Sequence, residues 1–328
     1  MKILITGSSG QIGTNLGLRL VRDGHQVIGI DCRPNPWTSA IPTHLVDLAQ
    51  VHPAGHGRLG PVETGAIDAI VHLAAHAKVH ALVERPVRAL ENHVMVTNAL
   101  EFARVNQVPI ILASSREVYG NAVSRQAPVP ESAADFRQAP SPYAAMKLAS
   151  EALAAAYRRC YGLPFAIIRF SNVYGRFDND LERLERAIWI FRRQLLAGLP
   201  VTVYGADKTL DFTYIDDAVD GLLRCLERLV AGDEAVAGET FNLAYGEGHL
   251  LVEVVQLIAA ALDRVPQIDL RPARPGEVTW YVADISKARH RLGYAPRVPV
   301  EQGIERAMLW AAEYEAGRFQ APAAGHFR

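Results

Sequence analysis

The chain has 328 residues, which is enough for one large domain or two ordinary domains with a substantial core. Its 34 basic and 35 acidic side chains nearly cancel, which argues against a nucleic-acid-binding protein. No stretch reaches the ~20 apolar residues of a membrane span, and the first residues lack the features of a signal sequence, so we expect a cytoplasmic protein.

Short β-branched runs alternate with segments of helical period over the first 170 residues. The expected strands are Lys2–Thr6, Gln26–Asp31, Ala69–Leu73, Pro109–Ala113 and Phe165–Phe170. This alternation predicts an α/β fold built on a doubly wound parallel sheet of the Rossmann type, with helices on both faces. After about Ser171 the alternation breaks, which predicts a smaller C-terminal α/β lobe for the substrate.

A glycine-rich segment, G-S-S-G-Q-I-G at residues 7–13, follows the first expected strand and opens a helix predicted from Gln11 to Asp23. Glycines at such a place allow a tight turn and let backbone N–H groups approach a pyrophosphate at the start of the helix. The predicted cofactor contacts in this segment are Gly7, Gly10, Gln11, Ile12 and Gly13.

Asp31 indicates which dinucleotide binds. It ends the second expected strand, where a carboxylate accepts hydrogen bonds from the adenosine ribose hydroxyls and repels a 2′-phosphate. We therefore expect NAD rather than NADP. Arg33 is the nearby residue that would favour the phosphate instead.

The segment S-P-Y-A-A-M-K at residues 141–147 has the features of a helix start, with Ser141 as the cap and Pro142 in the first turn. Tyr143 and Lys147 then share one face of the helix. The ammonium group lowers the pKa of the phenol, and a positively charged nicotinamide lowers it further, which predicts a phenolate base. The pair occurs by chance in many helices, so this interpretation depends on the glycine segment and Ser115.

Three histidines, His72, His76 and His80, recur at four-residue steps, a spacing that can hold zinc on a helix. His72, however, falls within an expected strand, so the helical phase breaks between the first two. We therefore predict no metal site.

Several further motifs stand in one order along the chain: A-S-S-R-E-V-Y-G (113–120), R-F-S-N-V-Y-G (169–175), D-F-T-Y-I-D-D (211–217) and R-P-G-E (274–277). Together with the glycine segment and the Tyr-Lys pair, they resemble the extended short-chain dehydrogenase/reductases that act on nucleotide sugars, in particular those similar to UDP-glucose 4-epimerase. The resemblance runs from Met1 to about residue 310.

The resemblance implies a role for many residues. The catalytic residues it implies are Ser115, Tyr143, Lys147 and Glu117. Beyond the glycine segment and Asp31, the cofactor contacts are Asp47, Leu48, Leu73, Ala74, Ala75, Asn92, Tyr143 and Lys147. The contacts to a nucleotide sugar, most simply a UDP-sugar, are Arg116, Asn172, Arg176, Tyr204, Lys208, Arg274 and Glu277.

The resemblance also implies an organisation. Residues 1–170 form the NAD-binding domain, with 208–240 returning to it, and residues 171–207 and 241–328 form the nucleotide-sugar-binding lobe. Helices near Arg85–Val105 and Tyr143–Tyr161 carry small and apolar side chains on faces that family members pair between subunits. We therefore expect a homodimer.

The chain departs from the family in two places. Leu210 stands directly before Asp211, where the family usually has an arginine that contacts the diphosphate, and Lys208 is the candidate replacement. Y-G-R replaces the frequent Y-G-P-R, which leaves Arg176 available for a phosphate or a sugar carboxylate.

The residues after Ser115 bear on the reaction. In the resembled family, 4,6-dehydratases have Thr-Asp-Glu in this turn, and an arginine cannot replace the aspartic acid as a proton donor. Decarboxylases of UDP-glucuronate tend to have Thr-Ser-Glu, and 4-epimerases carry small or neutral residues. We expect an NAD-dependent 4-epimerase, an isomerase that inverts C4 of a UDP-hexose or UDP-hexuronate through a transient 4-keto sugar. The alternatives are a decarboxylase or dehydratase, both lyases, and a non-catalytic NAD sensor.

The direction of Arg116 bears on the sugar. If Arg116 points into the substrate pocket, its guanidinium favours a uronate. If it points away from the pocket, Ser115 and Glu117 remain at the pocket floor, and the anionic Glu117 favours a neutral hexose. Alternation along an extended turn favours the outward direction. A simpler interpretation pairs Arg116 with Glu117 or with the charged segment 178–186, in which Glu182 and Arg186 are expected to lie on a solvated helix face.

Overall fold

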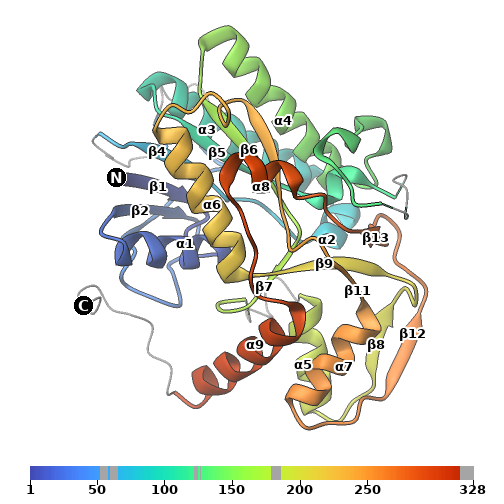
Figure 1. Ribbon diagram of the computed structural model, residues 1–328. Coiled ribbons are helices and arrows are strands. Elements are labelled where there is room, and N and C mark those ends of the chain that lie inside the picture. Colours follow the sequence, from blue (N-terminus) through green and yellow to red (C-terminus); the bar gives the residue numbers. More distant parts are fainter. Residues whose placement is uncertain (52–57, 60–65, 122–124, 126, 179–185, 318–328) are drawn as a thin grey trace.

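The computed structural model describes residues 1–51, 58–59, 66–121, 125, 127–178 and 186–317 (Figure 1). A parallel sheet of seven strands forms its centre, in the order β10-β6-β5-β4-β1-β2-β3. The strands are β1 (Lys2–Thr6), β2 (Gln26–Asp31), β3 (Thr43–Leu45), β4 (Ala69–His72), β5 (Ile110–Ser115), β6 (Phe165–Phe170) and β10 (Glu239–Leu243). The predicted doubly wound parallel sheet is confirmed. Ser115, expected on a turn, is instead the last residue of β5.

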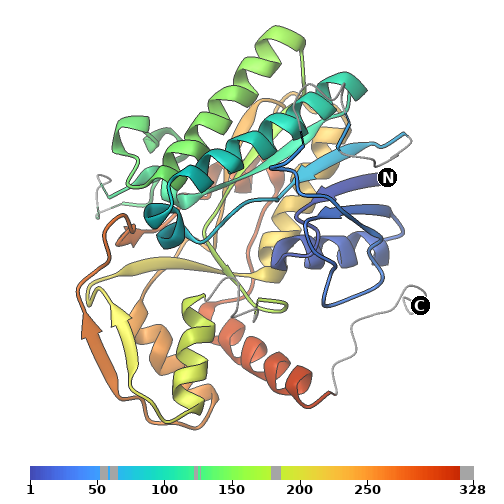
Figure 2. The same ribbon diagram turned by 180° about the vertical axis from the view of Figure 1, so that it is seen from behind.

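Helices cover both faces of this sheet (Figures 1 and 2). On one face lie α1 (Gln11–Arg22), α6 (Ile215–Val230) and α8 (Ser286–Leu292), and on the other lie α2 (Val79–Glu84), α3 (Val87–Asn106) and α4 (Pro142–Tyr161). Successive strand residues point to opposite faces, so Ile3 and Ile5 pack with Leu16 of α1, whereas Leu4 packs with Leu100 of α3. Burial on both sides explains why the strands are apolar almost throughout.

The second lobe lies beyond the carboxyl ends of the large sheet's strands (Figure 1). Its elements are β7 (Asn172–Tyr174), β8 (Val201–Tyr204), β9 (Thr209–Tyr214), β11 (Gly248–Leu250), β12 (Ile268–Arg271), β13 (Trp280–Tyr281), α5 (Ala187–Leu196), α7 (Leu251–Ala261) and α9 (Val300–Glu315). Strand β9 pairs with β7, β11 and β13, while β8 pairs with β12. The expected domain boundary at residue 241 cuts through β10, so the return to the large sheet extends to Leu243.

Two buried aspartates of the D-F-T-Y-I-D-D motif join the lobes. Asp211 of β9 accepts backbone N–H bonds from Tyr245 (3.0 Å), Gly246 (2.9 Å) and Ala283 (3.2 Å). Asp217 of α6 accepts backbone bonds from Arg297 and Val298. The motif therefore holds segments that are distant in sequence around the return of the chain. Within the described ranges, no helix has the length and apolar character needed to cross a membrane.

Candidate active site

The glycine segment forms a tight turn between β1 and α1. Gly7 has φ +74°, and a Cβ there would lie 2.7 Å from the backbone nitrogen of Ala74, while a Cβ on Gly13 would lie 2.2 Å from the carbonyl oxygen of Gly7. Gln11 opens α1, and neither atom of its buried side-chain amide has a hydrogen-bond partner within the described part of the chain. The close backbone approach and the unpaired amide fit a polar ligand at the start of the helix, as predicted for a dinucleotide.

Asp31 ends β2 beside this turn. Its carboxylate accepts backbone N–H bonds from Ser9 (3.0 Å) and Arg33 (3.2 Å). The guanidinium of Arg33 donates to the carbonyl of Ser9 at 3.1 Å and so folds against the turn. Farther along, Asp47 is exposed and accepts a bond from the backbone of Ala49, while Leu48 is buried in the core.

The loop after β4 contains the expected nicotinamide-side residues Leu73, Ala74 and Ala75. Asn92 of α3, a predicted cofactor contact, has its amide bonded at both ends to the backbone of His76, at 2.7 and 3.1 Å. Asn92 therefore positions this loop. The three histidines have separate partners: His72 contacts Thr6, His76 contacts Glu91, and His80 contacts Glu84.

Ser115, Tyr143 and Lys147 meet where β5 ends and α4 begins. The hydroxyl of Ser141 caps α4 by accepting the N–H bond of Ala144, with Pro142 in the first turn, as predicted. The side chain of Ser115 lies close enough to Tyr143 to lower the pKa of its hydroxyl. Lys147 is buried and donates from Nζ to the carbonyl oxygen of Ala113 at 2.7 Å, with Nζ 5.7 Å from the centre of the Tyr143 ring.

The ionisation of Tyr143 differs from the expectation. Burial raises the pKa of Tyr143 to about 12, against the lowering effects of the Ser115 hydrogen bond and of the charges on Arg186 and Arg116. Burial also lowers the pKa of Lys147 to about 8. The expectation that the lysine makes Tyr143 a phenolate is thus not met by the protein groups alone.

Arg116 points inward, so the outward prediction is wrong. Residues Arg116–Tyr119 form a short 3-10 helix, η1, rather than an extended turn, and this removes the expected alternation of side chains. The guanidinium donates from Nε to the Oδ1 of Asn172 at 3.1 Å and lies 2.9 Å from the carboxylate of Glu117. The pairing of Arg116 with Glu117 is the one that the simpler interpretation proposed, and both side chains are buried.

The other expected substrate contacts are already engaged with one another or with neighbours. Lys208 pairs with Glu277 at 2.8 Å, and the guanidinium of Arg274 stacks over the ring of Tyr204 at 3.8 Å. Arg176, expected to be available, pairs with Asp216 and lies 3.3 Å from the Oδ1 of Asn15. Asn172 also donates to the carbonyl of Asp211 at 2.9 Å.

Arg186 is a site residue that the sequence did not reveal. It precedes α5 and forms an ion pair of 2.8 Å with the buried Asp178, and its positive charge acts on Tyr143. Its expected partner on a solvated helix face, Glu182, lies outside the described residues. The sequence did not predict the Asp178–Arg186 pair, because helical spacing pairs residues three or four positions apart and these two are eight apart.

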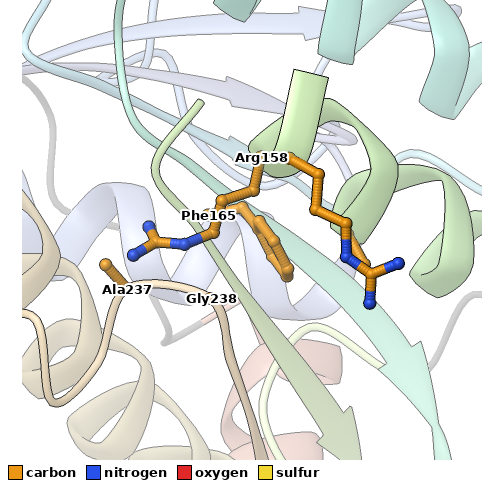
Figure 3. A pocket seen from close by; sticks show the side chains of 6 residues that line it. Arg158, Phe165, Ala237 and Gly238 are labelled. Atoms are coloured by element: carbon orange, nitrogen blue, oxygen red, sulfur yellow. The ribbon is translucent and has the colours of Figure 1, made fainter. Parts of the chain in front are cut away.

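A separate hollow of about 440 Å³ lies at the far end of α4 (Figure 3). It is lined by Ala155, Arg158, Arg159, Phe165, Ala237 and Gly238. Arg158 lies about 20 Å along the helix from Tyr143, given the rise of an α-helix. None of the candidate catalytic or cofactor-binding residues lines this hollow, so we assign the chemistry to the carboxyl ends of the strands.

The fold and the site define a dinucleotide-binding protein with a Ser-Tyr-Lys constellation beside the expected nicotinamide position. The sequence pattern described as the NAD dependent epimerase/dehydratase family matches residues 3–244. The chain belongs to this family.

Individual relatives extend the comparison over nearly the whole chain. The UDP-glucose 4-epimerase of Mycolicibacterium smegmatis is 30% identical over 94% of this chain and 97% of its own. Among solved structures, the UDP-glucose 4-epimerase of Thermotoga maritima with UDP-glucose superposes with a TM-score of 0.85 at 25% identity, covering 96% of this chain and 100% of that one. The UDP-glucuronic acid 4-epimerase of Bacillus cereus, in complex with UDP-glucuronic acid and NAD, gives 0.83 at 26% identity and the same coverage.

Proposed function

We propose that the protein is an NAD-dependent 4-epimerase of a UDP-sugar. The observation that carries the proposal is the meeting of Ser115, Tyr143 and Lys147 at the end of β5, beside the loop that follows β4. Relatives that span nearly the whole chain are UDP-glucose and UDP-glucuronate 4-epimerases, which supports the same reaction. The glycine turn, the unpaired amide of Gln11 and the carboxylate of Asp31 fit NAD.

In this proposal, Tyr143 takes the proton of the sugar C4 hydroxyl and later returns it, and Ser115 holds that hydroxyl by a hydrogen bond. Lys147 holds the nicotinamide ribose, and its ammonium charge supports the ionised tyrosine. When bound, NAD would supply the acceptor and donor of the C4 hydride, and its positive charge would add to the effects that lower the pKa of Tyr143. Return of the hydride to the other face of the 4-keto sugar inverts C4 without net oxidation.

We infer further that the preferred sugar is a neutral hexose. The positive groups that act on Tyr143 are Arg116 and Arg186, and each is paired with a buried carboxylate, Glu117 and Asp178 respectively. Burial raises the pKa of Asp178 to about 7, so the charge of its pair with Arg186 changes near neutral pH, but in both pairs a uronate would have to compete with an existing partner for the guanidinium. An inward Arg116 therefore does not imply a preference for a uronate, because its guanidinium already has a carboxylate partner.

The test is incubation of the purified protein and NAD with UDP-glucose, UDP-galactose, UDP-glucuronate and UDP-galacturonate, with products followed by mass spectrometry and NMR. Epimerisation leaves the mass of the sugar unchanged and replaces the NMR signals at C4 with those of the inverted sugar. We expect it to be fastest with UDP-galactose and UDP-glucose. Release of carbon dioxide from UDP-glucuronate would instead identify the decarboxylase, and loss of water the dehydratase. NAD binding without turnover of any sugar would identify the sensor.

We also propose that the protein is a homodimer. The helices α3 and α4 pack side by side on one face of the sheet (Figure 2), and α3 exposes Val87 and Leu90 to solvent. An apolar face of this kind is suited to pairing with a second copy. Light scattering at micromolar concentration is expected to give twice the mass of the chain, and a monomer would contradict the proposal.

A further inference from the structure

The face of α4 that carries Tyr143 and Lys147 has a third member, Glu151, one turn farther along. Each of the three contacts one of the last three residues of β5. The side chain of Tyr143 lies beside that of Ser115, Lys147 donates to the carbonyl of Ala113, and Glu151 accepts a hydrogen bond from the hydroxyl of Ser114. Together these three contacts hold α4 against the end of β5, the strand that ends at Ser115.

Glu151 is held by a two-point pair with an arginine that is itself fixed by other residues. Arg169 of β6 donates to both of its oxygens, from Nε at 3.0 Å and from a terminal nitrogen at 2.7 Å. Arg169 is fixed in turn by bonds to the hydroxyl of Tyr119 (3.0 Å) and the carbonyl of Glu131 (2.7 Å). The side chains of the Glu151–Arg169 pair are 11% and 7% exposed, so water screens this pair little.

We propose that Glu151 is a positioning residue for the epimerase reaction, which sets α4 against the end of β5 and supplies the negative charge that keeps Lys147 in its ammonium form. This inference rests on the proposed function. A buried two-point pair with arginine holds the carboxylate of Glu151 in place, and the third bond ties that carboxylate to the residue next to Ser115.

The electrostatics agree with this geometry. Burial lowers the pKa of Lys147, and the charge of Glu151 opposes that lowering. Surrounding elements contribute further ionisable groups near this face, namely His72, His93, Arg116, Glu117, Arg169 and Arg186. Burial and the charge of Lys147 lower the pKa of His72 to about 3, so this imidazole is neutral. Arg116 and Glu117 neutralise each other, and Arg169 is the partner of Glu151 itself.

The test compares pH profiles of kcat/KM for wild type and Glu151→Gln, because a lysine that must be protonated sets an alkaline limb. We expect the variant to shift that limb downward by about one pH unit, which is about a tenfold loss of rate on the limb. Glu151→Asp retains the charge and is expected to lower the rate while keeping the limb within about 0.3 pH units of wild type. Equal losses at all pH values for Glu151→Gln would overturn the proposal, since they indicate support of the fold alone.

Two controls separate the contributions. Ser114→Ala removes the hydrogen bond to Glu151 without changing any charge. The rate should therefore fall severalfold, while the alkaline limb of the pH profile stays at the same pH. Glu315→Gln breaks a second two-point arginine pair. Glu315 of α9 accepts two bonds of 2.7 Å from Arg192 of α5, away from Lys147. This variant should leave the profile unchanged, and a shifted limb in this control would contradict the assignment to Glu151.

A readout without turnover distinguishes failure of this inference from failure of the proposed function. Lys147 is proposed to hold the nicotinamide ribose, so NAD affinity measured by calorimetry should weaken between pH 7 and pH 9. That weakening should be severalfold larger in Glu151→Gln than in wild type. If no UDP-sugar is turned over but this difference is found, the effect of Glu151 on Lys147 stands and only the proposed reaction fails. If the two proteins weaken equally, the inference is wrong whatever the sugar assays give.

Discussion

The two sides of the site are built in different ways. On the cofactor side, Ser115, Tyr143 and Lys147 come from the end of one strand and the first turns of one helix, and their contacts follow from the periods of those elements. On the side facing the second lobe, Arg116, Asn172, Lys208 and Glu277 come from four segments and form two pairs across long stretches of sequence, Arg116 with Asn172 and Lys208 with Glu277. The proposed catalytic residues therefore depend on regular elements, whereas the expected substrate contacts depend on polar pairs between distant segments.

Tyr143→Phe tests the cofactor side and should have the largest effect. Removal of the hydroxyl should lower kcat by roughly 10²–10⁴-fold, the usual contribution of a positioned acid or base, while NAD binding stays close to wild type. Rapid-quench or NMR rate measurements and calorimetry check the two parts. Turnover within about threefold of wild type would show that another group carries the proton.

Arg116→Ala tests the lobe side. Loss of the guanidinium leaves the buried carboxylate of Glu117 without its partner and removes a donor to Asn172, so the free energy of unfolding should fall by about 3 kcal/mol. Urea denaturation measures this change. The double variant Arg116→Ala/Glu117→Ala should lose less than the sum of the single variants, because neither charge then remains unpaired. Additive losses would mean that the pair is not coupled.

Cofactor choice gives a smaller effect on the cofactor side. The carboxylate of Asp31 stands at the turn where it can accept bonds from the ribose diol, so NAD should bind at least about tenfold more tightly than NADP, or ~1.4 kcal/mol. Asp31→Ser should reduce this ratio by removing the repulsion of the 2′-phosphate. Equal affinities in the wild-type protein, measured by calorimetry, would refute the assignment.

Lys208→Gln should have the smallest effect. Lys208 is the candidate replacement for the family arginine at Leu210, but its ammonium is bound to Glu277 at 2.8 Å. We therefore expect KM for a UDP-sugar to change by less than about threefold, or ~0.7 kcal/mol. Glu277→Gln is the matched control, which frees the lysine and should lower KM if the diphosphate is within its reach. A much larger rise in KM for Lys208→Gln alone would restore the lysine as a phosphate ligand.

The sequence predicted what local periodicity controls. The parallel sheet, the capped start of α4, the face shared by Tyr143 and Lys147, and Asp31 at the end of β2 all follow from spacing within one element, and the structure has them. The prediction for Arg116 was wrong because the alternation of side chains along a strand was applied beyond the end of the strand. Alternation along a strand predicted an outward Arg116, but the chain turns into η1 directly after Ser115, whose hydroxyl accepts the N–H bond of Glu117.

Other features depended on contacts between distant segments. The pairs Asp178–Arg186 and Glu151–Arg169 lie outside any local pattern, and the second joins residues 18 positions apart on a helix and a strand. The raised pKa of Tyr143 has a similar origin, because burial depends on the packing of the whole site rather than on the neighbouring lysine. Such effects become predictable only once the fold is known.

The most direct test of the proposed epimerase is to follow hydrogen at C4 of the sugar. UDP-galactose carrying deuterium at C4 is incubated in ordinary water with the protein and NAD, and the UDP-glucose formed is examined by NMR and mass spectrometry. Because the hydride removed from C4 returns to the same carbon, the account predicts that the product retains its deuterium at C4. Exchange of the label with water, or absence of the inverted sugar under conditions where NAD is bound, would contradict it.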